Sequence, residues 1–300
     1  MKITNYHELT EEALKVGPGS IGVAWPDELE VLLAIAEASE MGLARFVLAG
    51  DVSRIRAQAE AHQIDLTGMT LIDEPDPQSA ALRIMRMIAA GEAQVAMKGQ
   101  VETRIFLHAA LDKEVGLRTG RLLSHVALFE IPNYPRLIFV SDAGVVILPT
   151  LEQKVEIVQN AVEVAQKIGI DKPKVAILGA NEMVNPKLPV SLDAASLSKM
   201  ADRGQIKGAL VDGPLALDNA VSVEAARIKG IVSPVAGEAD ILITPDLESG
   251  NMLAKSITYF AGGCMIGVVV GAKAPLIVTS RSDDHRAKLM SIALSVLLTK

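Results

Sequence analysis

Short apolar runs rich in Val, Ile and Leu alternate with longer segments of helical periodicity along almost the whole chain. Continuous apolar runs are typical of strands buried in parallel sheets, and apolar residues that recur every three or four positions are typical of helices. The runs predict strands at 20–25, 45–49, 69–72, 94–97, 124–130, 137–140, 174–178, 208–211, 240–244, 265–270 and 276–278. The segments between them predict helices at 27–40, 53–62, 78–90, 151–168, 193–203, 220–229, 250–260 and 283–298. This alternation predicts an α/β fold with parallel-rich sheets flanked by helices.

The chain is long enough for two domains. It has 300 residues, and a domain typically takes roughly 150. Two apolar strands are interrupted at 131–136, where Pro132, Asn133 and Pro135 break the apolar pattern. We therefore expect a change of domain near this segment.

The composition and net charge limit the kinds of ligand that the protein can be expected to bind. Half of the residues are hydrophobic but only 3% are aromatic, so the core is aliphatic. The 29 Lys and Arg face 36 Asp and Glu, which gives a net charge of −7. Nucleic-acid-binding proteins instead present a basic stripe and aromatic stacking platforms. We expect no nucleic-acid partner, and a phosphate-bearing ligand would need a local cationic pocket.

The sequence carries no sign of export or of membrane insertion. Its strongest apolar stretch, 261–272, is shorter than the about 18–20 residues that span a membrane. The first 20 residues include early acids and lack the apolar segment of a signal peptide. The single cysteine, Cys264, excludes an intramolecular disulfide and zinc motifs built from several cysteines. We therefore expect a cytoplasmic protein with no membrane partner.

Residues 17–22 match the dinucleotide-binding pattern GxGxxG letter for letter. In a nucleotide site these glycines follow a strand and open a helix, so that backbone N–H groups reach the pyrophosphate. Here the glycines come before the apolar run instead. We interpret the segment as a loop that enters a strand.

The segment after the last predicted strand carries the most chemistry. Thr279, Ser280 and Arg281 follow the apolar run, and a long helix is predicted to start at Asp283. A helix N-terminus attracts phosphate through its unpaired N–H groups and its dipole, and an arginine adds bidentate recognition of phosphate oxygens. The alternative is an ordinary helix cap at Ser282 or Asp283 beside a solvated Arg281. The segment alone leaves both interpretations open.

Two further segments could add cations to such a site. Lys98 and Gly99 again stand at the end of a predicted strand, where Lys98 would supply charge and Gly99 a close backbone approach. Arg118 lies in a loop broken by glycine. Each of these could equally be an exposed loop charge, but together they would form an anion site in an otherwise acidic protein.

Three aspartates, Asp142, Asp212 and Asp246, also follow predicted strands, where carboxylates can gather around a ligand. They could bind a divalent metal, but helix caps and solvated loops account for most aspartates at such positions. The chain offers no HExxH motif and no clustered histidines. We expect no metal site.

Several segments, taken in order, resemble the phosphate acetyl/butyryl transferases. They are Met97-Lys98-Gly99 with Thr103, 116–120, 123–126, 141–144, 181–187, 212–220, 245–251 and 279–283. Each is weak alone, but their order and spacing over nearly the whole chain make the resemblance specific. The Met-Lys-Gly, Leu-Arg-Thr-Gly and Leu-Ser-His segments resemble the butyryltransferase branch more than the acetyltransferase branch.

The resemblance implies the reversible reaction of acyl-CoA and phosphate to acyl phosphate and CoA, with a short or branched acyl group, butyryl foremost. It implies direct transfer in a ternary complex, CoA as a substrate, no required cofactor, and a homodimer or larger homo-oligomer. The alternatives are a phosphate acetyltransferase and a catalytically silent protein that binds CoA or acyl phosphate. A decarboxylating hydroxyacid dehydrogenase is a further alternative through its related two-domain architecture.

The same resemblance implies two α/β domains with the active site in the cleft between them, as in isocitrate and isopropylmalate dehydrogenases. Because the last helix of the family returns to the first domain, the expected domains are 1–132 plus 283–300 and 133–282.

The resemblance also implies roles for single residues. Arg281 would bind phosphate, and Ser280 would hydrogen-bond the reacting thioester or phosphate. The acetyltransferase branch has an aspartate further into the helix, where this chain has Ala287, so Asp283 is the nearest substitute as a base and Asp284 the next. Either aspartate could equally cap the helix. The expected substrate-binding residues are Lys98, Gly99, Arg118, Ser124, Asp142, Asp246, Asn251 and Thr279.

Overall fold

The structure, a computed structural model, describes residues 2–300 and divides into two compact units. The first unit comprises Tyr6–Arg121 and Ile266–Lys300, and the second comprises residues 2–5 and Leu122–Met265. Contacts thus divide the chain after residues 5, 121 and 265. The predicted domains, 1–132 plus 283–300 and 133–282, remain a prediction.

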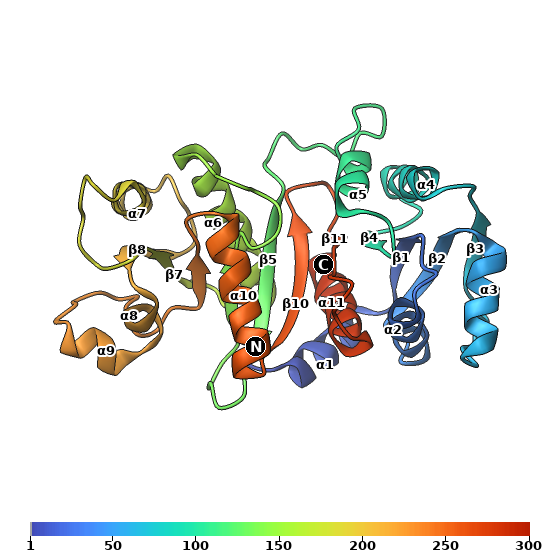
Figure 1. Cartoon of the computed structure of the whole chain (residues 1–300), viewed down its shortest axis with the longest axis horizontal. Coiled ribbons are helices and arrows are strands. Elements are labelled where there is room, and N and C mark those ends of the chain that lie inside the picture. The colour runs from blue at the N-terminus through green and yellow to red at the C-terminus, as the bar shows by residue number, and fades with distance from the viewer. Residues whose placement is uncertain (1) are drawn as a thin grey trace. The chain divides into compact units, whose positions relative to one another are not determined.

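The first unit is built from alternating strands and helices (Figure 1). Its elements are α1 (Tyr6–Val16), β1 (Gly19–Ala24), α2 (Leu29–Glu40), β2 (Ala44–Gly50), α3 (Val52–Ala61), β3 (Thr70–Asp73), α4 (Pro77–Ala89), β4 (Val95–Lys98), α5 (Thr103–Ala110), all but the first two residues of β10 (Cys264–Val270), β11 (Leu276–Ile277) and α11 (His285–Leu298). The strand order is β3-β2-β1-β4-β11-β10, parallel except at β10–β11. Helices α4 and α5 lie on one face of this sheet, and α2 and α11 lie on the other.

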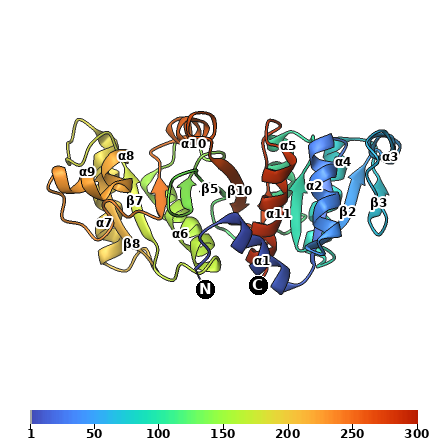
Figure 2. The ribbon, with the colours of Figure 1, turned by 90° about the horizontal axis from the view of Figure 1, so that it is seen from below.

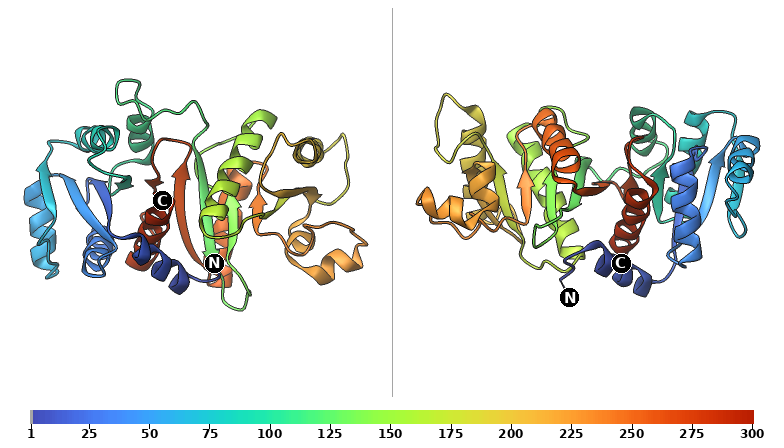
Figure 3. Two further views of the ribbon diagram at one scale, coloured as in Figure 1. Left: turned by 180° about the vertical axis from the view of Figure 1, so that it is seen from behind. Right: turned by 60° about the horizontal axis from the view of Figure 1, so that its bottom comes forward.

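Helix α11 is the most deeply buried helix of the first unit's core. Every residue from Ala287 to Leu297 is buried, because α11 packs against α1, α2 and β11 (Figure 3). A helix that is buried all round carries apolar residues on every face rather than on one stripe. The loop that precedes α11 is therefore attached to a rigid element.

The second unit repeats the α/β pattern. Its elements are β5 (Ser124–Glu130), β6 (Ile138–Ser141), α6 (Leu151–Lys167), β7 (Lys174–Leu178), α7 (Pro189–Asp202), β8 (Leu210–Leu215), α8 (Leu217–Val221), α9 (Val223–Ile228), β9 (Ile241–Ile243) and α10 (Leu247–Ala261). The strand order is β5-β6-β9-β7-β8, parallel except at β5–β6. Figure 2 shows α6 and α10 on opposite sides of the strands. Phe129, Val140 and Leu242 belong to a hydrophobic core cluster that includes Ala254 of α10.

The predicted α/β class, with parallel-rich sheets flanked by helices, is confirmed, and every predicted strand is present with ends shifted by a few residues at most. The finer part of that prediction, the likeness to isocitrate and isopropylmalate dehydrogenases with a site between domains, stays a prediction. The segment 131–136 forms the turn of the β5–β6 hairpin, with Asn133 in the left-handed region. Two antiparallel strands can be joined by such a short connection, whereas parallel strands need a longer crossover.

The helical predictions were incomplete at three places. The hydrophobic pattern did not predict α1 or α5, and it predicted a single helix at 220–229 where the structure has α8 and α9. Ser222 separates these two helices, because its hydroxyl accepts a hydrogen bond from the Ala225 N–H and caps α9. A serine that bonds to nearby backbone in this way favours a helix start over a helix interior.

The interpretation of the GxGxxG segment as a loop entering a strand is confirmed, because β1 begins at Gly19. A Cβ at Gly19 would lie 2.9 Å from a methyl of Val296 on α11, and one at Gly22 would lie 2.8 Å from a methyl of Ile84 on α4. These two glycines therefore let helices pack closely on both faces of the sheet.

Candidate active site

The segment at Lys98 and the segment that begins at Thr279 lie close together because they follow neighbouring strands, β4 and β11. Strands β4 and β11 run parallel, and Met97 lies opposite Ile277. The carboxyl ends of parallel strands open onto the same edge of a sheet, which is where such folds bind ligands. Lys98 and Thr279 consequently leave that edge side by side, although they are far apart in the sequence.

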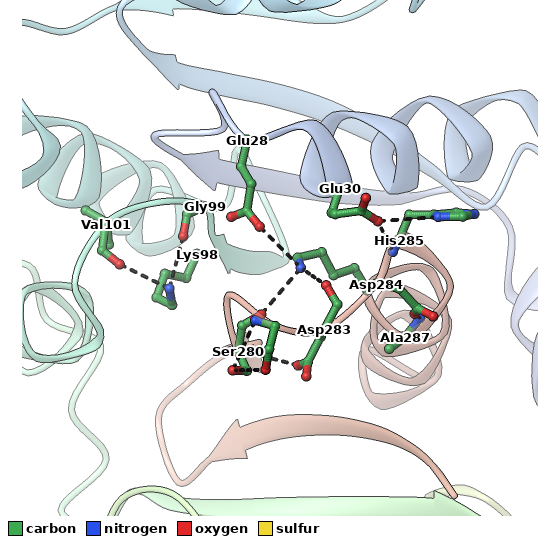
Figure 4. A network of polar contacts seen from close by, with 12 residues as sticks. Glu28, Glu30, Lys98, Gly99, Val101, Ser280, Asp283, Asp284, His285 and Ala287 are labelled. Atoms are coloured by element: carbon green, nitrogen blue, oxygen red, sulfur yellow. Dashed lines mark hydrogen bonds and ion pairs between the residues drawn. The ribbon is translucent and has the colours of Figure 1, made fainter. Parts of the chain in front are cut away.

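A short loop joins β11 to α11 and carries Ser280 and Arg281. Figure 4 shows Ser280 of this loop beside Asp283. The Asp283 carboxylate accepts a hydrogen bond from the Ser280 N–H at 2.7 Å, and the Asp283 N–H donates back to the Ser280 carbonyl at 3.2 Å. Asp284 is the helix N-cap, since its Oδ1 accepts from the Ala287 N–H at 2.9 Å. The two candidate bases thus have different local roles: Asp283 closes the loop and Asp284 caps the helix.

Lys98 is held inside the turn that follows β4. Only 4% of the residue is exposed, and its ammonium group donates to the carbonyls of Gly99 at 3.0 Å and Val101 at 3.1 Å. The same turn is bonded to the end of β1, because the Gly99 N–H donates to Ala24 O at 2.8 Å and the Gln100 N–H donates to Trp25 O at 2.9 Å. Backbone contacts thus fix the position of the charge.

These segments line a pocket of about 430 Å³. Its lining residues are Lys98, Val101, Glu102, Thr103, Arg104, Thr279, Ser280 and Arg281. Helix α5 begins at Thr103, and Glu102 before it makes no side-chain cap. The lining therefore combines three cationic side chains, three hydroxyl groups and one carboxylate. The cations and hydroxyls are donors suited to an anion such as phosphate.

The electrostatic environment of Lys98 supports that conclusion. Burial lowers the pKa of the Lys98 ammonium group below its ordinary value of 10.5; the Glu28 carboxylate opposes this shift, and the charges of Arg281 and Lys288 add to it. The pocket gathers like charges that repel one another when it holds no counter-ion. A bound anion would relieve this repulsion and favour the charged form of Lys98.

Three other predicted site residues come together in the second unit, around the start of α10. The Asp142 side chain is almost fully buried and accepts hydrogen bonds from the N–H groups of His125, Gly144 and Val145 at 2.7–2.9 Å. Asn251 donates to the Ala143 carbonyl at 3.3 Å. Thus Asp142 and Asn251 both organise the loop that follows β6.

Asp246 caps α10 within this cluster. Its Oδ1 accepts from the Ser249 N–H at 2.8 Å and from the Ser249 hydroxyl at 2.7 Å. Thr244 connects the cap to the neighbouring loop, because its hydroxyl lies 3.0 Å from Asp142 O and 3.3 Å from Asp246 O. The cluster has a clear structural function in positioning α10 and the loop after β6.

Asp246→Ala is expected to lower the free energy of unfolding by about 1 kcal/mol at neutral pH, as loss of an N-cap usually does. Its hydrogen bonds with Ser249 hold the pKa of Asp246 below its ordinary value of 3.8. A carboxyl with a lowered folded-state pKa stabilises the fold above its unfolded pKa, and this stabilisation is lost as the pH falls through the folded pKa. Urea unfolding should show a constant difference from wild type down to about pH 5 and a shrinking one below about pH 4.

Asp246→Asn serves as the control, because it keeps a capping oxygen without an ionisable group. Its stability relative to Asp246→Ala should not change with pH. A difference between wild type and Asp246→Ala that persists undiminished at pH 3 would contradict the linkage, and equal stability of all three proteins at pH 7 would contradict the cap.

Two predicted residues lie apart from these groups. Arg118 is in the first unit but does not line the pocket, and its backbone forms an isolated bridge with Ala272. Ser124 is fully buried in the second unit, where its hydroxyl accepts from the Asn160 side chain at 2.8 Å. The burial of Ser124 indicates a structural contact.

Two cations of the first unit, Arg104 and Lys288, were not predicted from the sequence. Arg104 lines the pocket from the first turn of α5, a helix that was not predicted. Lys288 is 1% exposed, and its ammonium group donates to the carbonyls of Ser280 and Asp283 in the loop before α11. The sequence gives no clear signal for the burial of Lys288, because it follows Arg286 after a single alanine and stands at the start of the apolar run rather than inside it.

The residues 2–300 contain no group of three or more His, Cys, Asp or Glu side chains placed to hold a metal ion. No helix among those residues is both long and apolar enough to cross a membrane.

Comparison with known proteins identifies the family. The family described as "Phosphate acetyl/butaryl transferase" matches residues 78–296. The chain is 44% identical over 296 residues to a phosphate butyryltransferase of Clostridium acetobutylicum, covering 99% of this chain and 98% of that protein. It is 42% identical over 294 residues to a phosphate acetyltransferase of Rhizobium meliloti, covering 98% and 93%.

A solved structure agrees with the sequence relatives. A branched-chain phosphotransacylase from Enterococcus faecalis superimposes with a TM-score of 0.82 at 32% identity, covering 93% of this chain and 98% of the other. The chain belongs to the phosphate acetyl/butyryl transferase family. It is a phosphate acyltransferase, an enzyme that transfers acyl groups between CoA and phosphate.

Proposed function

We propose that the protein transfers the butyryl group, or a branched acyl group of similar size, between CoA and phosphate. The pocket lined by Lys98, Arg104 and Arg281 carries this proposal, because an acidic protein concentrates cations there beside the Ser280 hydroxyl. The relatives named phosphate butyryltransferase and branched-chain phosphotransacylase support the choice of acyl group. A phosphate acetyltransferase is the second candidate, supported by the Rhizobium meliloti relative.

The proposed chemistry needs no covalent intermediate on the enzyme. A phosphate oxygen attacks the carbonyl carbon of the acyl-CoA thioester, the C–S bond breaks, and CoA leaves as a thiolate that takes up a proton. In the reverse direction a base removes the thiol proton, the thiolate attacks the carbonyl carbon of the acyl phosphate, the C–O bond to the phosphoryl group breaks, and phosphate leaves. Holding the two anionic reactants together and neutralising their charge lowers the barrier through proximity and preorganised electrostatics.

Each proposed residue has a role consistent with its position. Arg281 and Lys98 bind phosphate oxygens, and Arg104 contributes a further anion contact from α5. Ser280 hydrogen-bonds the reacting thioester or phosphate, and Thr279 lies beside it. Asp283 is the proposed base. Gly99 and Arg118, with Ser124, Asp142, Asp246 and Asn251 of the second unit, remain proposed substrate-binding residues.

The proposal extends to the setting of the reaction. The reaction as written uses CoA as a substrate and requires no resident cofactor. We also propose a cytoplasmic homodimer or larger homo-oligomer with no nucleic-acid or membrane partner, as composition and the family resemblance predict.

Butyryl-CoA and phosphate incubated with the protein should release CoA, whose free thiol is detected with a colorimetric thiol reagent. Parallel assays with acetyl-, isobutyryl- and hexanoyl-CoA should give the highest kcat/KM for the butyryl or isobutyryl thioester. One methylene in an apolar pocket changes discrimination by only about 1–3 kcal/mol, so neighbouring chain lengths should also react.

Two controls make the assay decisive. Omission of phosphate separates transfer from thioester hydrolysis, and CoA binding measured by calorimetry detects a silent binding protein. A preference for acetyl-CoA would establish the phosphate acetyltransferase instead. Binding of CoA without phosphate-dependent release from any thioester would refute the proposed function.

A further inference from the structure

Lys288 is a buried cation of the first unit to which the reaction as proposed gives no role. It lies in the first turn of α11 with 1% of its side chain exposed. The Asp283 and Ser280 carbonyls both accept hydrogen bonds from its ammonium group, the second at 3.4 Å. The same group lies 3.5 Å from a carboxylate oxygen of Glu28.

These contacts connect three separate segments of the chain. Ser280 and Asp283 are the two ends of the loop that carries Arg281, and Glu28 is the N-cap residue of α2. Glu30, in the first turn of α2, accepts a hydrogen bond from the His285 N–H at 2.6 Å, so the start of α11 is held as well. Figure 4 shows Glu28 facing Ser280 and Asp283 of the loop.

The cost of burying Lys288 indicates that the contacts are functional as well as structural. An ammonium group removed from water must recover its solvation from partners, and a well-packed apolar residue of the same size is often as stable or more stable. Here the partners are backbone carbonyls of the one loop that presents Ser280 and Arg281 to the pocket. The positive charge of Lys288 also acts electrostatically on the pocket, because it contributes to the lowered pKa of the pocket residue Lys98.

We propose that Lys288 is a positioning residue for phosphate: its ammonium group fixes both ends of the Ser280–Asp283 loop against α11, and so sets where Ser280 and Arg281 meet the anion. This inference rests on the proposed function, since it assigns the pocket to phosphate. Lys288 does not line the pocket and acts through the loop. It therefore controls the use of phosphate and leaves the preference among acyl groups unchanged.

Lys288→Met tests the proposal, because methionine fills a similar volume without charge or donors. A displacement of about 1 Å in reacting groups can cost about 100-fold, so kcat/KM for phosphate should fall at least about 10-fold. The order of preference among acyl-CoA thioesters should not change. Lys288→Arg keeps the charge and donors, and it should recover most of the lost kcat/KM.

Glu28→Gln separates the loop contacts from the ion pair. It removes the carboxylate charge but leaves the lysine bonded to the two carbonyls, so its kcat/KM for phosphate should stay within about threefold of wild type. The double variant Glu28→Gln with Lys288→Met leaves no unpaired buried charge, and it provides the measurement if Lys288→Met alone does not fold. An equal loss in Glu28→Gln and Lys288→Met would overturn the proposal.

Hydrogen exchange supplies a readout that does not depend on turnover. The Ser280 and Asp283 N–H groups should exchange at least about 10-fold faster in Lys288→Met than in wild type, because they open when the loop is released. The matched control is Lys154→Met in the second unit, a lysine of similar burial that pairs with Asp193 at 2.7 Å. It should lower stability without changing exchange in the Ser280–Asp283 loop.

The two proposals fail in different ways. Absence of phosphate-dependent turnover in the wild type overturns the proposed function, while exchange in the loop still reports on Lys288. Normal turnover in Lys288→Met with unchanged loop exchange overturns the positioning role, while the proposed function stands.

Discussion

Arg281→Ala is expected to lower kcat/KM for phosphate by at least about 100-fold, because removing one preorganised charge or donor from the reacting centre typically costs about 100- to 1,000-fold. Arg281 lines the pocket beside Ser280, and its charge contributes to the lowered pKa of Lys98. Initial rates at varied phosphate and fixed butyryl-CoA measure the effect. Both kcat and KM should change, because the guanidinium group binds phosphate before and during attack.

Arg286→Ala is the matched control for this variant. It removes the same charge from an exposed position in the first turn of α11, five residues further along the chain, and Arg286 does not line the pocket. Its kcat/KM should stay within about threefold of wild type. An equal loss in both variants would show that only the net charge near α11 matters, and near-normal kinetics of Arg281→Ala would remove the guanidinium group from the mechanism.

Arg281→Lys distinguishes charge from geometry. Lysine keeps the positive charge but presents a single point instead of a planar fork, so it cannot bind phosphate oxygens in the bidentate manner of arginine. Partial activity is expected, between that of wild type and Arg281→Ala. Full activity in Arg281→Lys would show that a point charge at this position is sufficient.

The strands were predicted well because a buried strand can be identified from the hydrophobicity of its own residues. A strand covered on both faces must be apolar at nearly every position, so β5 and β7 were predicted with their observed bounds. Helix α1 could also have been predicted from the sequence, because its buried residues Tyr6, Leu9, Thr10 and Ala13 recur at helical spacing. Helix α5 has only eight residues, too few for periodicity to be distinctive.

The candidate site was predicted only in part. The sequence shows which polar residues follow each strand, but it does not show which strands are neighbours in the sheet. Lys98 and the Thr279–Arg281 segment each stand at a strand end, which the sequence indicates. Their proximity depends on β4 and β11 being neighbours in the sheet, and that pairing joins strands separated by most of the chain. Sequence spacing could not show it.

The alternative roles of Asp283 and Asp284 illustrate the same limit. Adjacent aspartates before a helix look equivalent in sequence, since either can cap the first turn. The structure assigns the cap to Asp284 and leaves the Asp283 carboxylate on the Ser280 N–H, beside the proposed reacting groups. A shift of one residue at the start of α11 would exchange these roles, and no local pattern fixes that register.

Gly99→Ala is expected to have the largest effect on the fold of the candidate site. A Cβ at this position would lie 2.2 Å from the Trp25 carbonyl oxygen, 2.7 Å from the Trp25 carbonyl carbon and 2.9 Å from the Ala24 oxygen. These are backbone atoms, which cannot rotate away as a side chain does. The turn must therefore separate from the end of β1, breaking the hydrogen bonds from the Gly99 and Gln100 N–H groups.

The expected cost has two measurable parts. Forcing extra volume into a packed site destabilises by about 1–3 kcal/mol, occasionally more, and each kcal/mol lowers Tm by roughly 2–4 °C in domains of about 150–250 residues. Displacing the turn also moves the carbonyls of Gly99 and Val101 that hold the Lys98 ammonium group. Activity should then fall about 10- to 100-fold even in the molecules that remain folded.

Gly179→Ala provides the comparison, because neither glycine has a positive φ and a Cβ at Gly179 would meet Pro214 at an ordinary 3.4 Å. Thermal unfolding and kcat/KM for phosphate should change little in Gly179→Ala and strongly in Gly99→Ala. If Gly99→Ala loses stability but keeps full activity, the position of Lys98 does not depend on the contact of this turn with β1. If Gly99→Ala keeps both its stability and its activity, the turn can accommodate a Cβ despite the close approach to Trp25.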